Sequence, residues 1–265
     1  MKRVILILLL CSCAGLLACN APADSSFAQD IGAPNLPPQE LVYALRWDTS
    51  DVTLNPDSGG LFELVNDKAV RFVVDRGWLT SYSFEALVCA KGAGQNTWLP
   101  SLRDILIPRA WAGHSDIPVG PAKVRASFVE DLALLDQSQT AAVVLVNELR
   151  ICRLHLVLAR ADQFTSRWPT EVDMDTTTLH LEGRYLQGDV WQSFQWRTDV
   201  AWADIYDLPT EWDTGWGGVE ITVVRSLKHL LDGIDPKGQD PKDAARQVLQ
   251  NVIEHVVIQT KSHLN

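Results

Sequence analysis

Short runs of β-branched and aromatic residues recur along most of the chain, and glycine, proline, asparagine or aspartate ends nearly every run. Such runs favour β-strands, and the residues between them favour turns. The runs that we expect to form strands are residues 41–47, 69–74, 78–89, 122–129, 141–146, 150–161, 176–185, 190–200 and 218–225. Helical patterns do not alternate with them, which argues against a parallel α/β fold. The sequence therefore predicts a mainly β protein, an antiparallel β-sandwich.

Two of the expected turns matter for the pairing of strands. Asp75-Arg76-Gly77 separates two apolar runs, and we interpret it as a turn. Gln187-Gly188-Asp189 lies between two alternating runs, which predicts a β-hairpin. Residues 91–121 are broken repeatedly by glycine and proline, so we expect a long loop, and long loops in compact domains are often functional or mobile.

The hydrophobic period changes near the C-terminus. Residues 226–233 are expected to form a short helix that ends at Gly233. A second helix begins with Asp240 as its N-cap and Pro241 in its first position. Its apolar stripe is formed by residues three and four apart, namely Val248, Leu249, Val252, Ile253, Val256 and Val257. We therefore expect residues 41–265 to form one β-sandwich domain with a C-terminal amphipathic helix.

Two of the five cysteines, Cys89 and Cys152, lie far from the N-terminus, each in an apolar run that resembles a strand. In an exported protein such a pair predicts one disulfide, whereas two buried free thiols would be expected in its absence. The bond would close a loop of about 60 residues and add about 4 kcal/mol to stability in the chain-entropy model.

The N-terminus has the pattern of a secretory signal, because Lys2 and Arg3 precede an apolar run over residues 4–18. The positive charges would stay in the cytoplasm while the apolar run enters the membrane. That run is shorter than the ~20 residues that span a bilayer comfortably. We expect residues 1–18 to be a signal peptide.

Leu16-Leu17-Ala18-Cys19 resembles the bacterial lipobox, although Leu17 departs from the small or β-branched residue usual at its position. The resemblance implies that the Cys19 thiol receives a diacylglycerol and that cleavage occurs just before it. Cys13 is a second candidate with a shorter apolar region before it. The same N-terminal pattern would also fit secretory cleavage without lipidation, or retention of the apolar run as a membrane anchor.

The residues after Cys19 indicate where the lipidated protein would be held. Asn20 is not the aspartate of the enteric inner-membrane retention signal, which favours the outer membrane of the bacterial cell envelope. Residues 19–40 contain four prolines, two serines and one glycine and few large apolar residues, so we expect a flexible lipidated tether. Two or three acyl chains would hold the protein stably on a membrane that it does not span.

Charge and motif content exclude several classes of function. Loss of Lys2 and Arg3 with the signal would change the net charge from −10 to −12, which disfavours nucleic acid and anionic lipid headgroups as partners. The sequence contains no G-x-S-x-G, P-loop, helix-opening G-x-G-x-x-G or C-x-x-C-H motif, and we predict that the protein is not an enzyme. Glu130, Asp131 and Asp204 are interpreted as solvent-side or turn residues.

The chain contains ten tryptophans, and five of them lie between Trp191 and Trp216. Trp212 and Trp216 flank a glycine-rich segment that we expect to be an exposed loop. Exposed aromatic rings can stack on sugars or form a hot spot for a protein partner. Tryptophans can equally serve to cap the ends of a sandwich.

The six histidines show no tight ligand pair such as H-x-H or H-E-x-x-H. His114 lies in the predicted long loop, where it could join other histidines and a carboxylate around a copper or zinc ion. The histidines can also be interpreted as isolated surface residues.

The chain combines a lipobox, strands, Ala112-Gly113-His114, a cysteine-bearing strand and a late segment, residues 230–235, with the sequence Leu-Leu-Asp-Gly-Ile-Asp. This order resembles uncharacterised bacterial β-sandwich lipoproteins, some similar to periplasmic copper-binding proteins associated with methanobactin systems. Those proteins carry four cysteines, and only Cys89 and Cys152 are available here, so the resemblance supplies no ligand. We expect an envelope lipoprotein that binds a ligand or a protein partner, and we keep metal binding and glycan binding as competing hypotheses.

We predict that Cys19→Ala moves the protein from the membrane fraction to the soluble periplasmic fraction, because the acylated thiol is its expected anchor. Fractionation followed by immunoblotting measures this distribution. Unchanged membrane fractionation would contradict an anchor at Cys19.

Overall fold

The computed structural model describes residues 38–89, 123–124, 127–135, 137–146, 150–213 and 217–263. All of them belong to one compact unit, Leu36–Asn265. Several predictions lie outside the described residues: the signal peptide, Cys19, most of the tether, the loop over residues 91–121 with His114, and Trp216. The first strand begins at Gln39 rather than at residue 41.

One sheet has four strands in the order β13-β12-β1-β7. Its strands are β1 (Gln39–Asp48), β7 (Gln139–Val146), β12 (Gly218–Ser226) and β13 (Val256–His263). β1 and β12 run parallel, with Leu41 opposite Val219, whereas β1–β7 and β12–β13 are antiparallel. Most of the chain separates β1 from β12, far more than the roughly twelve residues that a parallel pair requires as a connection.

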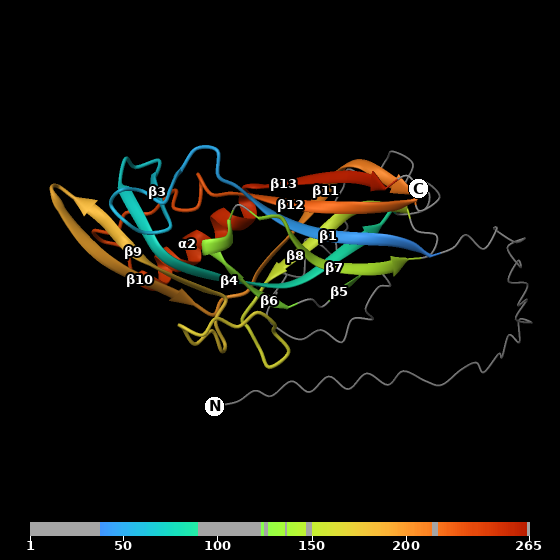
Figure 1. The fold of residues 1–265 in the computed structure, drawn as a ribbon, viewed down its shortest axis with the longest axis horizontal. Helices are drawn as coiled ribbons and strands as arrows, with labels where there is room; N and C mark the ends of the chain where they lie inside the picture. The colour runs from blue at the N-terminus through green and yellow to red at the C-terminus, as the bar shows by residue number, and fades with distance from the viewer. Residues whose placement is uncertain are drawn as a thin grey trace, which may run out of the picture. The chain divides into compact units, whose positions relative to one another are not determined.

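The second sheet is built on the long strand β4 (Arg71–Val88). Its other strands are β2 (Thr53–Leu54), β3 (Phe62–Val65), β5 (Lys123–Val124), β6 (Phe128–Asp131), β8 (Arg150–Leu158), β9 (Leu179–Gln187), β10 (Val190–Thr198) and β11 (Trp202–Asp213). The first half of β4 pairs with β3 and β9, the second half pairs with β5, β6 and β8, and β11 pairs with β8 (Figure 1). The predicted mainly β, sandwich-like fold with a C-terminal helix is confirmed.

The turn expected at Asp75-Arg76-Gly77 is wrong, because β4 continues through it with a register shift between Val74 and Arg76. A Cβ on Gly77 would lie 2.6 Å from Cδ1 of Leu132 and 2.7 Å from Cδ1 of Leu181. The glycine therefore allows close packing over a strand that bends, which is a recognised use of glycine inside strands. The predicted hairpin is confirmed, with Val190 opposite Gln187.

The helix α2 (Pro241–Glu254) begins as predicted, since the Asp240 side chain accepts a hydrogen bond from the backbone N–H of Lys242 at 2.8 Å. Its buried face packs against β9, β10, β11 and β12. The helix is shorter than expected, because Val256 and Val257 belong to β13. No helix among the described residues is long and apolar enough to cross a membrane.

Residues 226–233 do not form the expected helix. Ser226 ends β12, and residues 227–233 form consecutive turns, in which the N–H of Leu230 bonds to the carbonyl of Leu227 at 3.1 Å and that of Asp232 bonds to the carbonyl of His229 at 3.2 Å. These are three-residue steps, typical of tight turns rather than of an α-helix. Gly233, with φ 75°, ends the segment.

A buried ion pair joins the two sheets. Arg225 of β12 and Glu130 of β6 are 1% and 3% exposed, and Nη1 of the arginine lies 2.5 and 2.6 Å from the two carboxylate oxygens. The Ser81 hydroxyl of β4 donates to Glu130 at 2.6 Å and accepts from Nη2 of Arg225 at 2.9 Å. The expectation that Glu130 faces solvent is therefore wrong, because its charge is neutralised inside the protein.

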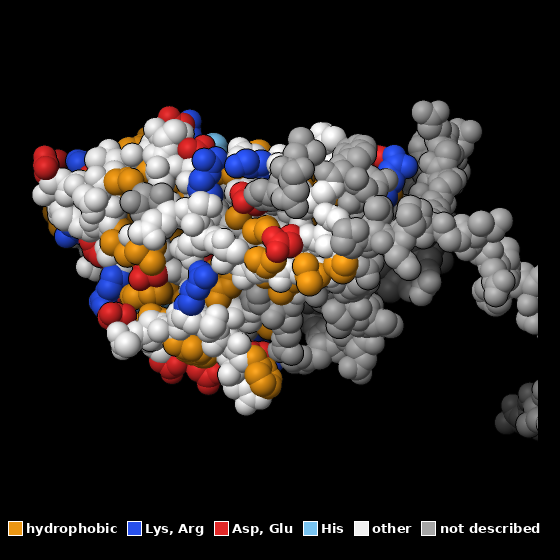
Figure 2. All heavy atoms as spheres, turned by 45° about the vertical axis from the view of Figure 1, so that its right-hand side comes forward, with side chains coloured by type: hydrophobic (Ala, Val, Ile, Leu, Met, Phe, Trp, Pro, Cys, Tyr) orange, Lys and Arg blue, Asp and Glu red, His pale blue; other side chains and the backbone are white. Residues whose placement is uncertain are grey.

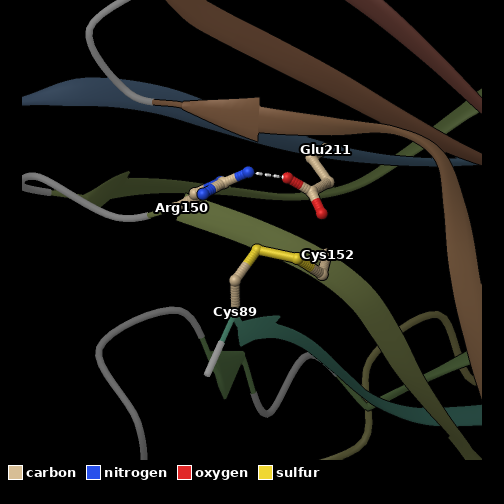
Figure 3. The surroundings of a disulfide bond; sticks show 4 residues. All are labelled: Cys89, Arg150, Cys152 and Glu211. Atoms are coloured by element: carbon tan, nitrogen blue, oxygen red, sulfur yellow. Dashed lines mark hydrogen bonds and ion pairs between the residues drawn. A yellow bond between two sulfur atoms is a disulfide. The ribbon is translucent and has the colours of Figure 1, made fainter. Parts of the chain in front are cut away.

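The predicted disulfide between Cys89 and Cys152 is present and links the end of β4 to β8 (Figure 3). The two cysteines are 63 residues apart in sequence, and their Cα atoms are separated by 5.2 Å. A loop of this length corresponds to a stabilisation of about 4 kcal/mol in the chain-entropy model.

Glu130→Ala should lower the free energy of unfolding by about 3–5 kcal/mol, because it leaves the guanidinium of Arg225 buried without a counter-ion. Denaturant unfolding with the disulfide intact measures the change. The control is Asp51→Ala, which removes an exposed ion pair to Lys228 and should cost less than about 1 kcal/mol. Equal losses in the two variants would contradict the assigned role of the pair.

Candidate metal centre

The turns over residues 227–234 are held in place by two buried asparagines from other elements. Asn66, just after β3, donates to the carbonyls of Leu231 and Ile234, both at 2.9 Å. Asn251 of α2 donates to the carbonyls of Leu230 at 3.1 Å and of Asp232 at 2.8 Å. Buried carbonyls need donors, so these four hydrogen bonds fix the course of the segment.

Asp67, which follows Asn66 in the chain, fixes the end of the turns over residues 227–234. Its backbone N–H donates to Oδ1 of Asp232 at 3.1 Å, and its carboxylate accepts from the N–H of Gly233 at 2.7 Å. Nζ of Lys68 donates to the carbonyl of Gly233 at 2.6 Å. The carboxylate of Asp232 is thus oriented by a hydrogen bond from a separate loop.

Three side chains with metal-ligand chemistry meet above this framework. Nδ1 of His229 lies 2.6 Å from Oδ2 of Asp232. His255 caps the C-terminal end of α2, and its ring stacks on that of His229 with 4.3 Å between the centroids and 22° between the planes. One ligand atom from each of the three residues lies within 4.8 Å of the others, and all three side chains are half-buried.

Two imidazole nitrogens and a carboxylate oxygen form a donor set used for zinc and copper. Ligands at 2.0–2.1 Å from a tetrahedral ion lie about 3.4 Å from one another, so side-chain shifts of about 1 Å would close the group around an ion. Three protein ligands leave a fourth position for water or an exchangeable ligand. His229, Asp232 and His255 therefore form a candidate metal centre.

A second cluster with metal-ligand atoms consists of Cys89, Cys152 and Glu211. Its sulfur atoms are bonded to each other, and Glu211 pairs with Arg150 (Figure 3). Metal ligation by cysteine requires thiolates, which a disulfide does not offer. This cluster is a covalent link between strands.

Trp212 does not occupy the exposed position that its glycine-rich surroundings predict. The residue lies on β11 opposite Ile151 of β8, and only 4% of it is exposed. A ring that faces the core cannot stack on a ligand in solvent. Trp212 is therefore not available for the predicted ligand contact. Trp196 is buried as well and stacks on Phe194, whereas Trp191 is half-buried beside the guanidinium of Arg184.

Another polar cluster surrounds His180, which is buried on β9. Its Nε2 lies 2.8 Å from Oε1 of Glu182, which also accepts from Gln195 at 2.9 Å and pairs with Arg76 at 2.7 Å. Burial acts to raise the pKa of Glu182, but the hydrogen bonds from His180 and Gln195 and the charge of Arg76 lower it below its usual range. The carboxylate is fully engaged, which suits a structural role.

The sequence contains the residues of the candidate centre but offers no reason to group them. His229 and His255 are 26 positions apart, and only the return of the chain through α2 brings them together. The segment over residues 230–235 was the available signal, because it contains Asp232 and follows His229 directly.

Comparisons with known proteins do not assign the chain to a family. No family model matches the chain, and no curated protein matches it. A solved structure described as MbnP from Methylosinus trichosporium is distantly similar, with a TM-score of 0.38 and 9% sequence identity over 85% of this chain and 99% of that chain.

Asn251→Ala should reduce the free energy of unfolding by about 2–4 kcal/mol, because the buried carbonyl of Leu230 and the part-buried carbonyl of Asp232 lose their donor. Urea unfolding measures this loss. Arg246→Ala, on the exposed face of the same helix, should cost less than about 0.5 kcal/mol. If the two helix variants were equally stable, the asparagine would not be holding the segment.

Proposed function

We propose that this protein is a non-enzymatic metal-binding lipoprotein of the bacterial cell envelope, which holds a first-row transition-metal ion between His229, Asp232 and His255. The observation that carries the proposal is the proximity of two imidazoles and a carboxylate, with one ligand atom from each within 4.8 Å of the others. The expected lipid at Cys19 and the flexible tether would keep the metal-binding domain at a membrane surface.

The framework behind the ligands supports this proposal over a chance meeting of surface side chains. Hydrogen bonds from Asn66, Asp67 and Asn251 hold the segment that carries His229 and Asp232. Groups behind the ligands orient them and tune the affinity of metal sites, and their loss typically costs 10–100-fold in binding. A half-buried position also leaves the site open to ions or to a metal-donating partner.

The donor set favours copper over zinc as the first ion to test. A site of nitrogen and oxygen donors binds Cu²⁺ more tightly than Zn²⁺ in the Irving–Williams order. The described part of the site contains no thiolate to favour Cu⁺. The open fourth coordination position suits a metal ion that is transferred to a partner rather than one that is bound permanently.

Titration of the full chain with Cu²⁺ should give one strong site, with at least tenfold weaker binding in His229→Ala and in His255→Ala. Isothermal titration calorimetry measures the affinity. Electron paramagnetic resonance of the bound Cu²⁺ should show coupling to two imidazole nitrogens, and Zn²⁺ should bind the same site more weakly.

His114→Ala is the matched control, because His114 is the histidine that the sequence alone would place in a metal site. We expect its affinity to equal that of the unchanged protein. Loss of binding in His114→Ala with retention in His229→Ala would move the site to the other histidine, and no strong site in the unchanged protein would refute the proposal.

A further inference from the structure

The connection between β8 and β9, here called the 159–178 loop, exposes two aromatic side chains. Phe164 is 69% exposed and Trp168 is 39% exposed. Every other phenylalanine, tyrosine and tryptophan in the described ranges is buried or half-buried. Aromatic residues are enriched in protein–protein interfaces, so two exposed ones on the same loop make it a candidate contact surface.

The loop is pinned to the body of the protein near its first aromatic residue. The buried hydroxyl of Thr165 lies 2.7 Å from that of Ser127, and Ser166 exchanges backbone hydrogen bonds with Ser127 and Val129 at 2.9 and 3.0 Å. The N–H of Phe164 donates to Oδ1 of Asp162 at 2.9 Å. The aromatic residues are therefore presented by an ordered backbone.

The second aromatic residue is fixed by its neighbours in the same way. The indole N–H of Trp168 donates to the carbonyl of Thr165. The guanidinium of Arg167 lies 4.6 Å from the ring centre of Phe128 and donates to Gln139 at 2.6 Å. A preorganised surface loses less conformational entropy when a partner binds.

The charged residues of the loop are mostly acidic, with four acidic residues and two basic ones. Glu171, Asp173 and Asp175 are exposed. The loop has two basic residues, Arg160 at its start and Arg167, whose guanidinium is already engaged by a ring and a side-chain amide. Figure 1 places this connection, drawn in yellow, along the lower edge of the domain, and Figure 2 shows hydrophobic and acidic side chains next to one another along that edge. A loop that exposes both aromatic and acidic side chains complements a partner that is both apolar and positively charged.

We propose that the 159–178 loop is a docking surface for a basic polypeptide segment, in which lysines or arginines surround one or two large apolar side chains. A neutral glycan would use the aromatic rings but not the carboxylates. A second copy of this acidic chain would meet its own negative charge, and anionic lipid headgroups would be repelled as well. The surface is distinct from the metal centre and does not depend on it.

The test uses the full chain and a dye-labelled peptide of about twelve residues with four lysines around two leucines. Fluorescence anisotropy should show saturable binding that weakens as salt is added, as expected for opposite charges at a surface. Phe164→Ser and Trp168→Ser should each weaken binding at least fivefold, and Glu171→Lys should weaken it at low salt. The same peptide with glutamate in place of lysine should not bind.

Two substitutions serve as matched controls, because they change an exposed apolar residue and an exposed acidic residue elsewhere. Val190→Ser on β10 and Asp57→Lys before β3 should leave the affinity unchanged. Equal weakening by Val190→Ser and Phe164→Ser, or by Asp57→Lys and Glu171→Lys, would reduce the binding to general attraction and overturn the proposal. Absence of saturable peptide binding would also overturn the proposal. So would tighter binding of chitohexaose than of the peptide, if that binding is lost in Phe164→Ser and Trp168→Ser.

Discussion

The ion pair between Arg225 and Glu130 is the contact on which the arrangement of the two sheets depends. Removal of two charges from water costs several kcal/mol for each ion, and only close mutual hydrogen bonds offset that cost. Here the carboxylate meets the guanidinium and the Ser81 hydroxyl, while Nε of Arg225 has no hydrogen-bond partner among the described residues. The pair tolerates little displacement, so it selects one register: a slip of β12 by one residue would turn Arg225 outward and Val224 inward.

That register also decides where the candidate metal centre lies. β12 ends at Ser226, and the N–H of Leu227 then bonds to the carbonyl of Asp48 at the end of β1. Four residues after Arg225 the chain reaches His229, whose surroundings are held by Asn66 from one side and Asn251 from the other. An ion that binds only this folded arrangement would stabilise it by mass action, so metal affinity and the stability of the segment are linked.

Local patterns in the sequence predicted much of the fold but little of the site. Alternation located most strands, the capping residues located the start of α2, and the cysteine pair indicated the disulfide. The remaining elements depend on pairing between distant segments. Val257 continues an apolar helical stripe in the sequence, yet it lies in β13 opposite Val224, because the edge of β12 provides backbone hydrogen-bond partners. The local sequence suggests that Glu130 faces solvent and that Trp212 lies in an exposed loop. Both side chains are buried, because strands that are distant in the sequence pack against them.

The proposed docking surface and the candidate metal centre both adjoin strands that contain a residue of the buried ion pair. β6 holds Glu130, and its residue Val129 bonds through its backbone to Ser166 of the 159–178 loop. β12 holds Arg225 and leads directly into the segment of His229 and Asp232. The ion pair therefore connects the strand beneath the proposed docking surface with the strand that leads into the candidate metal centre. One buried contact thus links the two strands that lead to these surface segments, and removal of either charge would leave the other buried without a counter-ion.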